Sequence, residues 1–343
     1  MSFLQSFSQS VTDSWYQKGV GWTRMLLPLS GLFEFVAKCR KARYLRKERW
    51  QSPVPVIVVG NISIGGTGKT PVVGALVREL QQRGYKPGIV SRGFGAKHVT
   101  YPISVTSDSD PSLVGDEPVM LACQLQVPLV VDSDRVQAAQ YLLQQFDCDL
   151  IIADDGLQHY SLSRDIEVLV LDGERMLGNG LCLPAGPLRE PPERMQTVDV
   201  VLINGNAQKP LPAAIQPLND HSFYLQPDQL MPVNPEQQGL VPSNTKVHAV
   251  AGIGNPERFF TTLSELGYKV VPHGYPDHHA FVAEDIQFDD MLPVLMTAKD
   301  AVKCQAFADR RHWYLPVTTC LPEEVLSQIM ALIKARTETK FSV

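Results

Sequence analysis

Residues 63–70 combine glycines, a lysine and hydroxyl-bearing side chains directly after an apolar stretch, 54–60. They are Ser63, Ile64, Gly65, Gly66, Thr67, Gly68, Lys69 and Thr70. Backbone N–H groups of small residues can turn inward around an anion, a lysine can reach terminal phosphates, and a hydroxyl group can hold Mg²⁺. A helix predicted over 71–83 would point its partly positive N-terminus at the same anion. We therefore interpret the loop as a nucleoside triphosphate site, in which Lys69 contacts phosphates and Thr70 contacts the metal.

Ser63 departs from the usual form of such a loop, which has glycine at this position. Gly65, Gly66 and Gly68 still provide the conformational freedom that the turn needs. The alternative interpretation is an ordinary glycine-rich turn between a strand and a helix. The order of strand, loop, Gly-Lys-Thr and helix favours the phosphate site.

Asp154 ends a second apolar stretch, 149–153, and is followed by another carboxylate. From this position a protein with such a phosphate loop normally holds Mg²⁺, directly or through water. The alternative is that the two aspartates cap a turn. Because Gln158 and His159 follow closely, the segment has more polar function than a turn requires. We predict Asp154 as a metal ligand, and Asp155, Gln158 and His159 as further members of the site.

A phosphoryl transfer enzyme also needs a group that orients and deprotonates an acceptor hydroxyl, and a carboxylate, alone or backed by a histidine, can do this. Asp116 and His278 are the candidates. The alternative for Asp116 is a helix cap before Pro118. The segment 184–190, set by proline and glycine, adds Arg189 beside Glu190. An arginine suits charge on a transferred phosphoryl group or a phosphate on the substrate.

Strand and helix patterns alternate around these residues. Strands are predicted at 86–91, 128–132, 149–153, 166–172 and 198–204, and helices at 71–83, 118–125 and 135–146. Such alternation predicts a mostly parallel sheet covered by helices on both faces, with ligands beyond the carboxyl ends of the strands. A smaller second α/β unit follows. We divide the chain into an N-terminal anchor (1–50), a P-loop core domain (51–205), a linker with one short strand (206–245) and a C-terminal α/β domain (246–343).

The bulk composition narrows the choice of partners. The chain has 343 residues, and its formal net charge of -5 gives no overall attraction to nucleic acid. The six cysteines form no CxxC pair, which suits a reducing compartment and indicates neither a zinc site nor a disulfide scaffold. We expect no nucleic-acid partner and no obligate protein partner.

The N-terminus combines an apolar run, 25–37, with seven lysines and arginines in 38–49. No secretory signal is apparent, and the apolar run is too short to span a bilayer. An apolar segment followed by a dense basic cluster is typical of an anchor on an anionic membrane surface. The alternative is a helix packed on the domain with a solvated basic face.

These residues together resemble the tetraacyldisaccharide 4'-kinase family, the lipid A 4'-kinases of Gram-negative bacteria. The matching motifs are SIGGTGKTP (63–71), SRGFG (91–95), GDEP (115–118), SDR (133–135), DDGLQH (154–159), LDGERMLGNG (171–180), PAGPLRE (184–190), YPDHHAF (275–281) and TAKDAVK (297–303). The resemblance implies transfer of the γ-phosphate of ATP, with Mg²⁺, to the 4'-hydroxyl of an acylated glucosamine disaccharide 1-phosphate, which gives lipid IVA. It also implies a peripheral or monotopic enzyme on the cytoplasmic leaflet of the inner membrane.

The same resemblance assigns roles to individual residues. It makes Asp116 the general base, assisted by His278, and Arg135 a substrate or phosphate contact. It places Asp154, Asp155, Gln158, His159, Arg189 and Glu190 in the active site. Ala298 interrupts what is commonly an acidic TEKD pattern, so the role of 297–303 stays open.

Two other functions are compatible with the phosphate loop. A P-loop switch or metallochaperone-type NTPase would act through partner binding, and a second kinase class would phosphorylate a soluble small molecule. Neither explains the apolar and basic N-terminus.

Overall fold

The structure is a computed structural model that describes residues 3–17, 19, 21–46, 48–93, 100–208, 211, 213–216 and 219–341. Phe94 and Gly95 of the SRGFG motif and Lys47 of the basic cluster lie outside the described residues.

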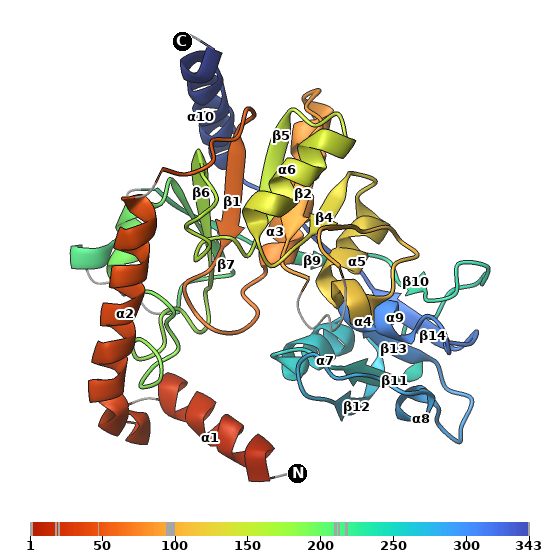
Figure 1. Cartoon of the computed structure of the whole chain (residues 1–343). Coiled ribbons are helices and arrows are strands. Elements are labelled where there is room, and N and C mark those ends of the chain that lie inside the picture. The colour runs from red at the N-terminus through yellow and green to blue at the C-terminus, as the bar shows by residue number, and fades with distance from the viewer. Residues whose placement is uncertain are drawn as a thin grey trace.

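An eight-stranded sheet forms the larger lobe, in the order β3-β4-β2-β5-β1-β6-β7-β8 (Figure 1). Its strands are β1 (Val56–Gly60), β2 (Pro87–Ser91), β3 (Ile103–Ser104), β4 (Leu129–Val131), β5 (Leu150–Asp154), β6 (Ile166–Asp172), β7 (Val200–Asn204) and β8 (Asp220–Phe223). Every neighbouring pair is parallel except β3 with β4. This arrangement confirms the predicted α/β class with a mostly parallel sheet.

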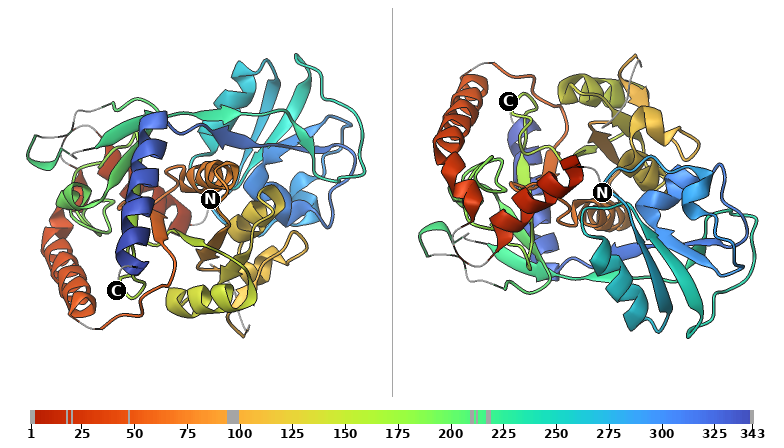
Figure 2. Two further views of the ribbon diagram at one scale, coloured as in Figure 1. Left: turned by 90° about the horizontal axis from the view of Figure 1, so that it is seen from above. Right: turned by 90° about the horizontal axis from the view of Figure 1, so that it is seen from below.

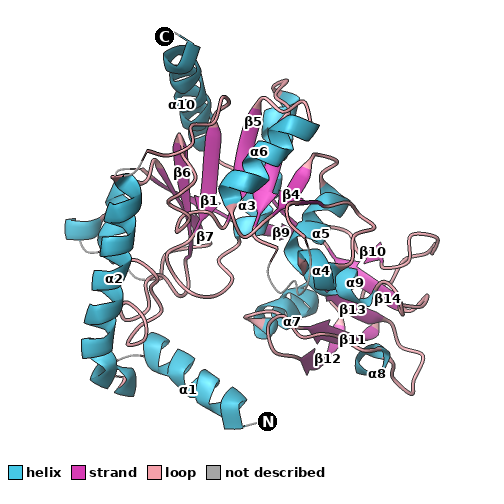
Figure 3. Ribbon diagram, in the orientation of Figure 1, coloured by secondary structure: helices cyan, strands magenta, loops and turns pink. Residues whose placement is uncertain are grey.

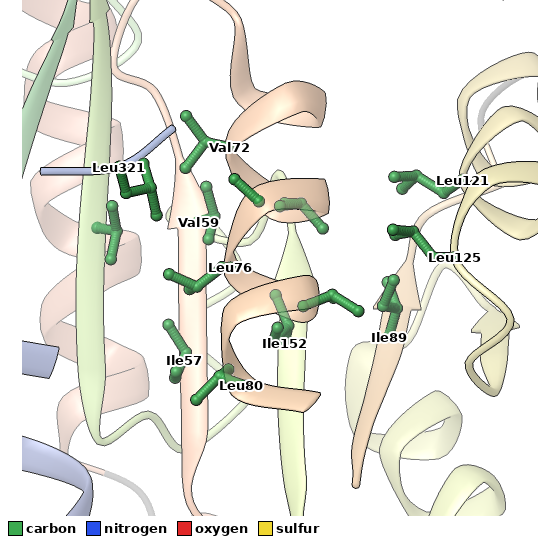
Figure 4. Close-up of a cluster of buried hydrophobic side chains, with 14 of the residues drawn as sticks. Ile57, Val59, Val72, Leu76, Leu80, Ile89, Leu121, Leu125, Ile152 and Leu321 are labelled. Atoms are coloured by element: carbon green, nitrogen blue, oxygen red, sulfur yellow. The ribbon is translucent and has the colours of Figure 1, made fainter. Parts of the chain in front are cut away.

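Helices cover both faces of this sheet, which explains why its central strands β1 and β5 are buried at every position (Figure 3). On one face, α3 (Lys69–Gln82) and α5 (Asp116–Gln124) bury Val72, Leu76 and Leu121 in one hydrophobic cluster with Ile57, Ile89 and Ile152 of the sheet (Figure 4). On the other face lies α6 (Arg135–Gln145), which begins where the Asp134 carboxylate accepts a hydrogen bond from the N–H of Val136 at 2.9 Å. The sheet is therefore a rigid platform for the loops at its edge.

The smaller lobe is built on a five-stranded sheet in the order β10-β14-β13-β11-β12 (Figure 2). Its elements are β10 (Met231–Pro232), β11 (Lys246–Ala251), α7 (Pro256–Glu265), β12 (Lys269–Gly274), α8 (Ala283–Ile286), β13 (Val294–Thr297), α9 (Ala298–Cys304) and β14 (His312–Leu315). After it, β15 (Val317–Thr319) pairs with β9 (Leu225–Pro227), and α10 (Glu323–Phe341) follows. Leu321 and Val325 join the hydrophobic core of the larger lobe, so the C-terminal segment ties the two lobes together.

Two segments contain more regular structure than their sequences predict. The segment 206–245, expected to hold one strand, contributes β8 to the large sheet, β10 to the small sheet and β9 to the connection between them. No strand or helix is predicted between residues 91 and 118, yet the segment 100–114 contains β3 and the four-residue helix α4 (Pro111–Val114). All of them are short, and the strands lie at sheet edges, so that a periodic hydrophobic pattern does not develop. The four-part division of the chain stays a prediction.

The N-terminal segment consists of α1 (Phe3–Tyr16), a 3₁₀ turn η1 (Trp22–Leu26) and α2 (Leu27–Leu45). In all three views α2 lies along the side of the large sheet that faces away from the small lobe (Figures 1 and 2). Across the described part of the chain, no helix has the length and apolar character needed to cross a membrane.

Candidate active site

A cleft of about 1750 Å³ opens between the two lobes. The larger lobe lines it with the phosphate loop and with side chains that follow β2, β5, β6 and β7. The smaller lobe contributes residues of 253–266, Asp277, His278 and Lys299. Ligands of open parallel sheets bind outside the carboxyl ends of the strands, and this cleft occupies that position.

Gly68 gives the phosphate loop its shape. Its φ of 94° lies in the left-handed region, and a Cβ there would come within 2.8 Å of the Asn204 amide nitrogen. The next residue, Lys69, begins α3, so the first unpaired N–H groups of that helix face the cleft beside Gly65 and Gly66. The local geometry matches an anion-binding helix N-terminus.

Ser63 occupies a position where the fold has no need of glycine. It forms an antiparallel bridge with Leu188, and its side chain is 4% exposed. The backbone there is extended and paired, whereas the left-handed φ values fall on Gly65 and Gly68. Ser63 and Thr67 are both buried beneath the loop and do not line the cleft. The departure from the usual motif therefore leaves the phosphate-binding surface intact.

Asp155 links the phosphate loop to the segment 184–190. Its Oδ1 lies 3.6 Å from Nζ of Lys69, and its Oδ2 lies 3.3 Å from Nη1 of Arg189. Burial alone would raise the pKa of Asp155, but these two cations bring it below its usual value. Asp155 also has a φ of 48°, an uncommon conformation for a residue with a side chain. The carboxylate therefore stays ionised and holds both cations at the cleft.

Gln158 holds Arg189 by a hydrogen bond, and Glu190 in turn holds Gln158. The Gln158 amide oxygen accepts a hydrogen bond from Arg189 at 3.3 Å, and its NH₂ group donates to Glu190 at 2.8 Å. Glu190 is 4% exposed and lies 3.3 Å from Nε of Arg194. Of these groups Arg189 and Gln158 line the cleft, whereas Glu190 supports them from the interior.

Asp154 fits a role in holding a cation. Burial raises its pKa to about 7, and its Oδ1 has no hydrogen-bond partner among the described residues. Within the same residues no group of three or more His, Cys, Asp or Glu side chains could hold a metal. Mg²⁺ usually binds through one or two protein groups together with substrate phosphates, so Asp154 and Thr70 at the cleft form a suitable set.

His159 and Arg135 differ in their access to the cleft, because His159 lines it and Arg135 does not. Burial, with the nearby charges of Arg135 and Arg92, lowers the pKa of His159 to about 4, so its ring is neutral. Arg135 is fully buried, and burial lowers its pKa to about 10. Its Nη1 donates to the Asp132 carbonyl, and it does not line the cleft. A direct contact between Arg135 and a substrate stays a prediction.

Asp116 and His278 come from different lobes and meet in the cleft. Nδ1 of His278 lies 3.3 Å from Oδ2 of Asp116, which is 7% exposed in the first turn of α5. Gly115, whose φ of 96° is easily adopted only by glycine, makes the sharp turn from α4 into α5 that delivers this carboxylate. The two candidates named from the sequence, whose pairing only the family resemblance implied, therefore lie together in the cleft.

Lys299 and Lys303 complete this constellation, and sequence reasoning missed both. Nζ of Lys299 lies 3.2 Å from Glu117 and from Asp277, and 3.8 Å from Oδ2 of Asp116. Burial would raise the pKa of Asp116, but the hydrogen bond with His278 and the charges of the two lysines keep it below its usual value. Asp116 is therefore a carboxylate near neutral pH, as a proton acceptor must be.

The segment 297–303 acquires a clear role from these contacts. Thr297 caps α9, since its hydroxyl oxygen accepts a hydrogen bond from the N–H of Asp300. The same hydroxyl donates a hydrogen bond to the Asp300 carboxylate at 2.7 Å. The helix then presents Lys299 and Lys303 one turn apart toward Asp116. The Thr-x-x-Asp spacing predicts the helix cap from sequence. The contact of the two lysines with Asp116 depends instead on how the lobes pack.

The substitution Lys299→Met tests whether the charge of Lys299 lowers the pKa of the Asp116–His278 pair. Removing the cation raises the pKa of the Asp116–His278 pair, because Lys299 lowers the pKa of both members. Activity that needs the deprotonated base is then lost at a higher pH during acidification, so we expect the acid limb of the kcat/KM profile to move upward. Lys86→Met, which removes a surface lysine paired with Asp147, is the control. An unshifted acid limb would contradict the role.

Comparisons with known proteins agree with this geometry. Residues 22–334 match the family described as Tetraacyldisaccharide-1-P 4'-kinase. The chain is 45% identical over 343 residues to the tetraacyldisaccharide 4'-kinase of Nitrosococcus oceani, with 99% of each chain covered. It is 49% identical over 333 residues to the same enzyme of Alcanivorax borkumensis, with 95% of this chain and 98% of that one covered.

A solved structure supports the same assignment. LpxK from Aquifex aeolicus, crystallised in complex with ATP, is similar with a TM-score of 0.74 and 28% identity, over 91% of this chain and 99% of that one. The sequence match, the shared fold and the cleft with its phosphate loop agree, and the chain belongs to the tetraacyldisaccharide 4'-kinase family.

Proposed function

We propose that this chain binds ATP and Mg²⁺ in the cleft and transfers the γ-phosphate to the 4'-hydroxyl of a tetraacylated glucosamine disaccharide 1-phosphate, forming lipid IVA. The chain is an ATP-dependent kinase by family, and its relatives are named for this substrate. The observation that carries the proposal is the placement of the Asp116–His278 pair in the same cleft as the phosphate loop.

In the mechanism that we propose, the Asp116 carboxylate accepts the proton of the acceptor hydroxyl as that oxygen attacks the γ-phosphorus. The bond between this phosphorus and the β,γ-bridging oxygen breaks, and ADP leaves. His278 contacts Oδ2 of this carboxylate through Nδ1 and shares the proton that Asp116 accepts. Lys299 stabilises the negative charge of the carboxylate group before transfer. Transfer then needs only alignment of the hydroxyl with the phosphorus, since phosphoryl transfer depends mainly on positioning and electrostatic stabilisation.

The phosphate side of the cleft supplies the positive charge. Lys69 contacts the terminal phosphates, and Arg189 stands opposite it across Asp155. Thr70 and Asp154 would hold Mg²⁺, which supplies neutralisation of the charge that develops on the phosphates. His159, neutral because its pKa is low, can donate a hydrogen bond without adding charge. We assign Ser63, Ile64, Gly65, Gly66, Thr67 and Gly68 to the wall and support of the phosphate site.

We also propose that the enzyme works at the cytoplasmic leaflet of the inner membrane as a peripheral or monotopic protein. The side chains of Leu29, Leu32 and Val36, spaced three and four residues apart along α2, are 54%, 60% and 56% exposed. This spacing places them on one side of the helix. Arg40 and Arg43 follow them and are exposed, and Arg40 also lines the cleft. An apolar stripe next to basic residues suits the surface of an anionic leaflet.

Two substitutions on α2 test the membrane contact. We expect Leu32→Ser with Val36→Ser to reduce co-sedimentation with anionic phospholipid vesicles by about tenfold or more, because each buried aliphatic side chain contributes about 1.5–3 kcal/mol. Leu240→Ser is the matched control, because Leu240 is 82% exposed and lies outside α2, in the segment 206–245. Unchanged vesicle binding of the double variant would rule out this face as the contact.

A radiolabel assay tests the function itself. Purified protein, Mg²⁺ and γ-labelled ATP are incubated with the acylated disaccharide 1-phosphate in mixed micelles. Label should move onto the lipid, and the signal should vanish without Mg²⁺. Label released only as free phosphate, at a rate that the lipid does not change, would point instead to a switch-type NTPase.

A further inference from the structure

A buried set of hydrogen bonds attaches the N-terminal segment to the loop 182–189. The Thr23 hydroxyl donates to the Ala185 carbonyl at 2.9 Å. The Ser30 hydroxyl donates to the Cys182 carbonyl at 2.9 Å and accepts from the N–H of Ala185 at 2.9 Å. Thr23 is fully buried and Ser30 is 5% exposed, so water competes little for these bonds.

The other side of the same loop is bonded to the phosphate loop. The N–H of Ile64 donates to the Pro187 carbonyl at 2.9 Å, and the N–H of Arg189 donates to the Ile62 carbonyl at 2.6 Å. These two bonds flank the bridge between Ser63 and Leu188. The loop 182–189 is therefore held between the N-terminal segment and the start of the phosphate loop.

The hydrogen bonds on the two sides of the loop 182–189 connect the N-terminal segment to the phosphate site. Arg189, at the end of the loop, reaches Asp155 at 3.3 Å, and Asp155 faces Lys69 at 3.6 Å. A shift of the loop would move Arg189 and release the backbone partners of Ile62 and Ile64 together. Active-site groups must be held to well within about 1 Å of their productive positions. The N-terminal segment is thus in a position to set the geometry of the phosphate site.

We propose that Thr23 and Ser30 are positioning residues for phosphate binding, which they support through the loop 182–189. The N-terminal segment then has a role in nucleotide binding that is separate from membrane contact. Its two functions use different sides of the segment. The hydroxyls of Thr23 and Ser30 are buried against the loop, whereas Leu29, Leu32 and Val36 are exposed. A simple membrane tether would require the second set of contacts only.

The test uses the full chain in detergent micelles without vesicles, and compares Thr23→Val with Thr23→Ser. Valine has nearly the shape of threonine but lacks the hydroxyl, whereas serine keeps it. We expect Thr23→Val combined with Ser30→Ala to raise the Kd for ATP by about three- to tenfold, with a parallel rise in the KM for ATP. Thr23→Ser should stay within about twofold of the unmodified protein. Ser10→Ala, at an exposed serine of α1, is the control.

The kinetic part of this test rests on the proposed function, but the ATP titration does not. If the unmodified protein transferred no label to lipid, the kinase proposal would fail while the difference in ATP affinity could still appear. Unchanged ATP affinity in the double variant would overturn the positioning role, as would a loss of activity seen only on vesicles. An equal loss in Thr23→Val and Thr23→Ser would overturn the role of the hydroxyl. Thermal unfolding curves identify any variant that fails to fold. If the double variant does not fold, the ATP affinities of Thr23→Val and Thr23→Ser decide whether the hydroxyl has the positioning role.

Discussion

Asp116→Ala is expected to lower kcat by about 10²–10⁴-fold while ATP still binds with nearly its normal Kd. Loss of a positioned general base costs an amount in this range. The side chain of Asp116 contacts His278 and the two lysines of α9, and none of the groups of the phosphate loop. Chemistry and nucleotide binding should therefore separate in this variant. Single-turnover transfer of label, combined with an ATP titration, measures the two effects independently.

The result would be read against Asp147→Ala, a surface carboxylate paired with Lys86, which should leave both quantities unchanged. Weak ATP binding by Asp116→Ala, with a normal rate constant once ATP is saturating, would contradict the base assignment. The variant should still fold, because Lys299 keeps Glu117 and Asp277 as partners at 3.2 Å. A defect in kcat would then reflect the missing carboxylate.

Much of this site could be predicted from the sequence because its signals are local. The phosphate loop is one continuous segment, and its order of strand, loop and helix sets the positions of Lys69 and Thr70. Asp154 ends an apolar strand, and in a parallel sheet the end of a strand is also the edge of the ligand site. Such residues are placed by secondary structure, which the hydrophobic pattern reveals. Their roles remain predictions until variants are measured.

The parts that could not be predicted depend on packing between distant segments. Lys299 reaches Asp116 only because α9 packs against α5 across the two lobes. The buried position of Arg135, and the paired backbone that makes a serine suitable at position 63, likewise follow from tertiary contacts. The short edge strands β8 and β9 carry too few residues for a period to appear. Each of these features needs the neighbouring segment before its function can be inferred.

Lys69→Ala is expected to reduce kcat/KM for ATP by about 10²–10³-fold or more, through a different cause. The Lys69 ammonium group lies in the cleft with 12% of the side chain exposed, and it forms an ion pair with Asp155 at 3.6 Å. A preorganised cation in a partly desolvated site stabilises charge on the phosphates strongly, and removing one such group costs about 10²–10³ in rate. After the substitution, Asp155 loses its ion pair with Lys69 and keeps its ion pair with Arg189. ATP affinity should fall together with the rate.

This pattern separates the two halves of the cleft. If Lys69 acts on phosphates and Asp116 on the acceptor, Lys69→Ala should raise the Kd for ATP, whereas Asp116→Ala should not. The combined variant should then show both defects, since Lys69 and Asp116 share no ion-pair partner among the residues that the structure describes. Lys86→Ala, which removes a surface lysine, is the control for loss of charge. If ATP affinity stayed normal in Lys69→Ala and only the pH profile changed, the cation would belong to the proton-transfer side, and the assignment of the loop to phosphate binding would be wrong.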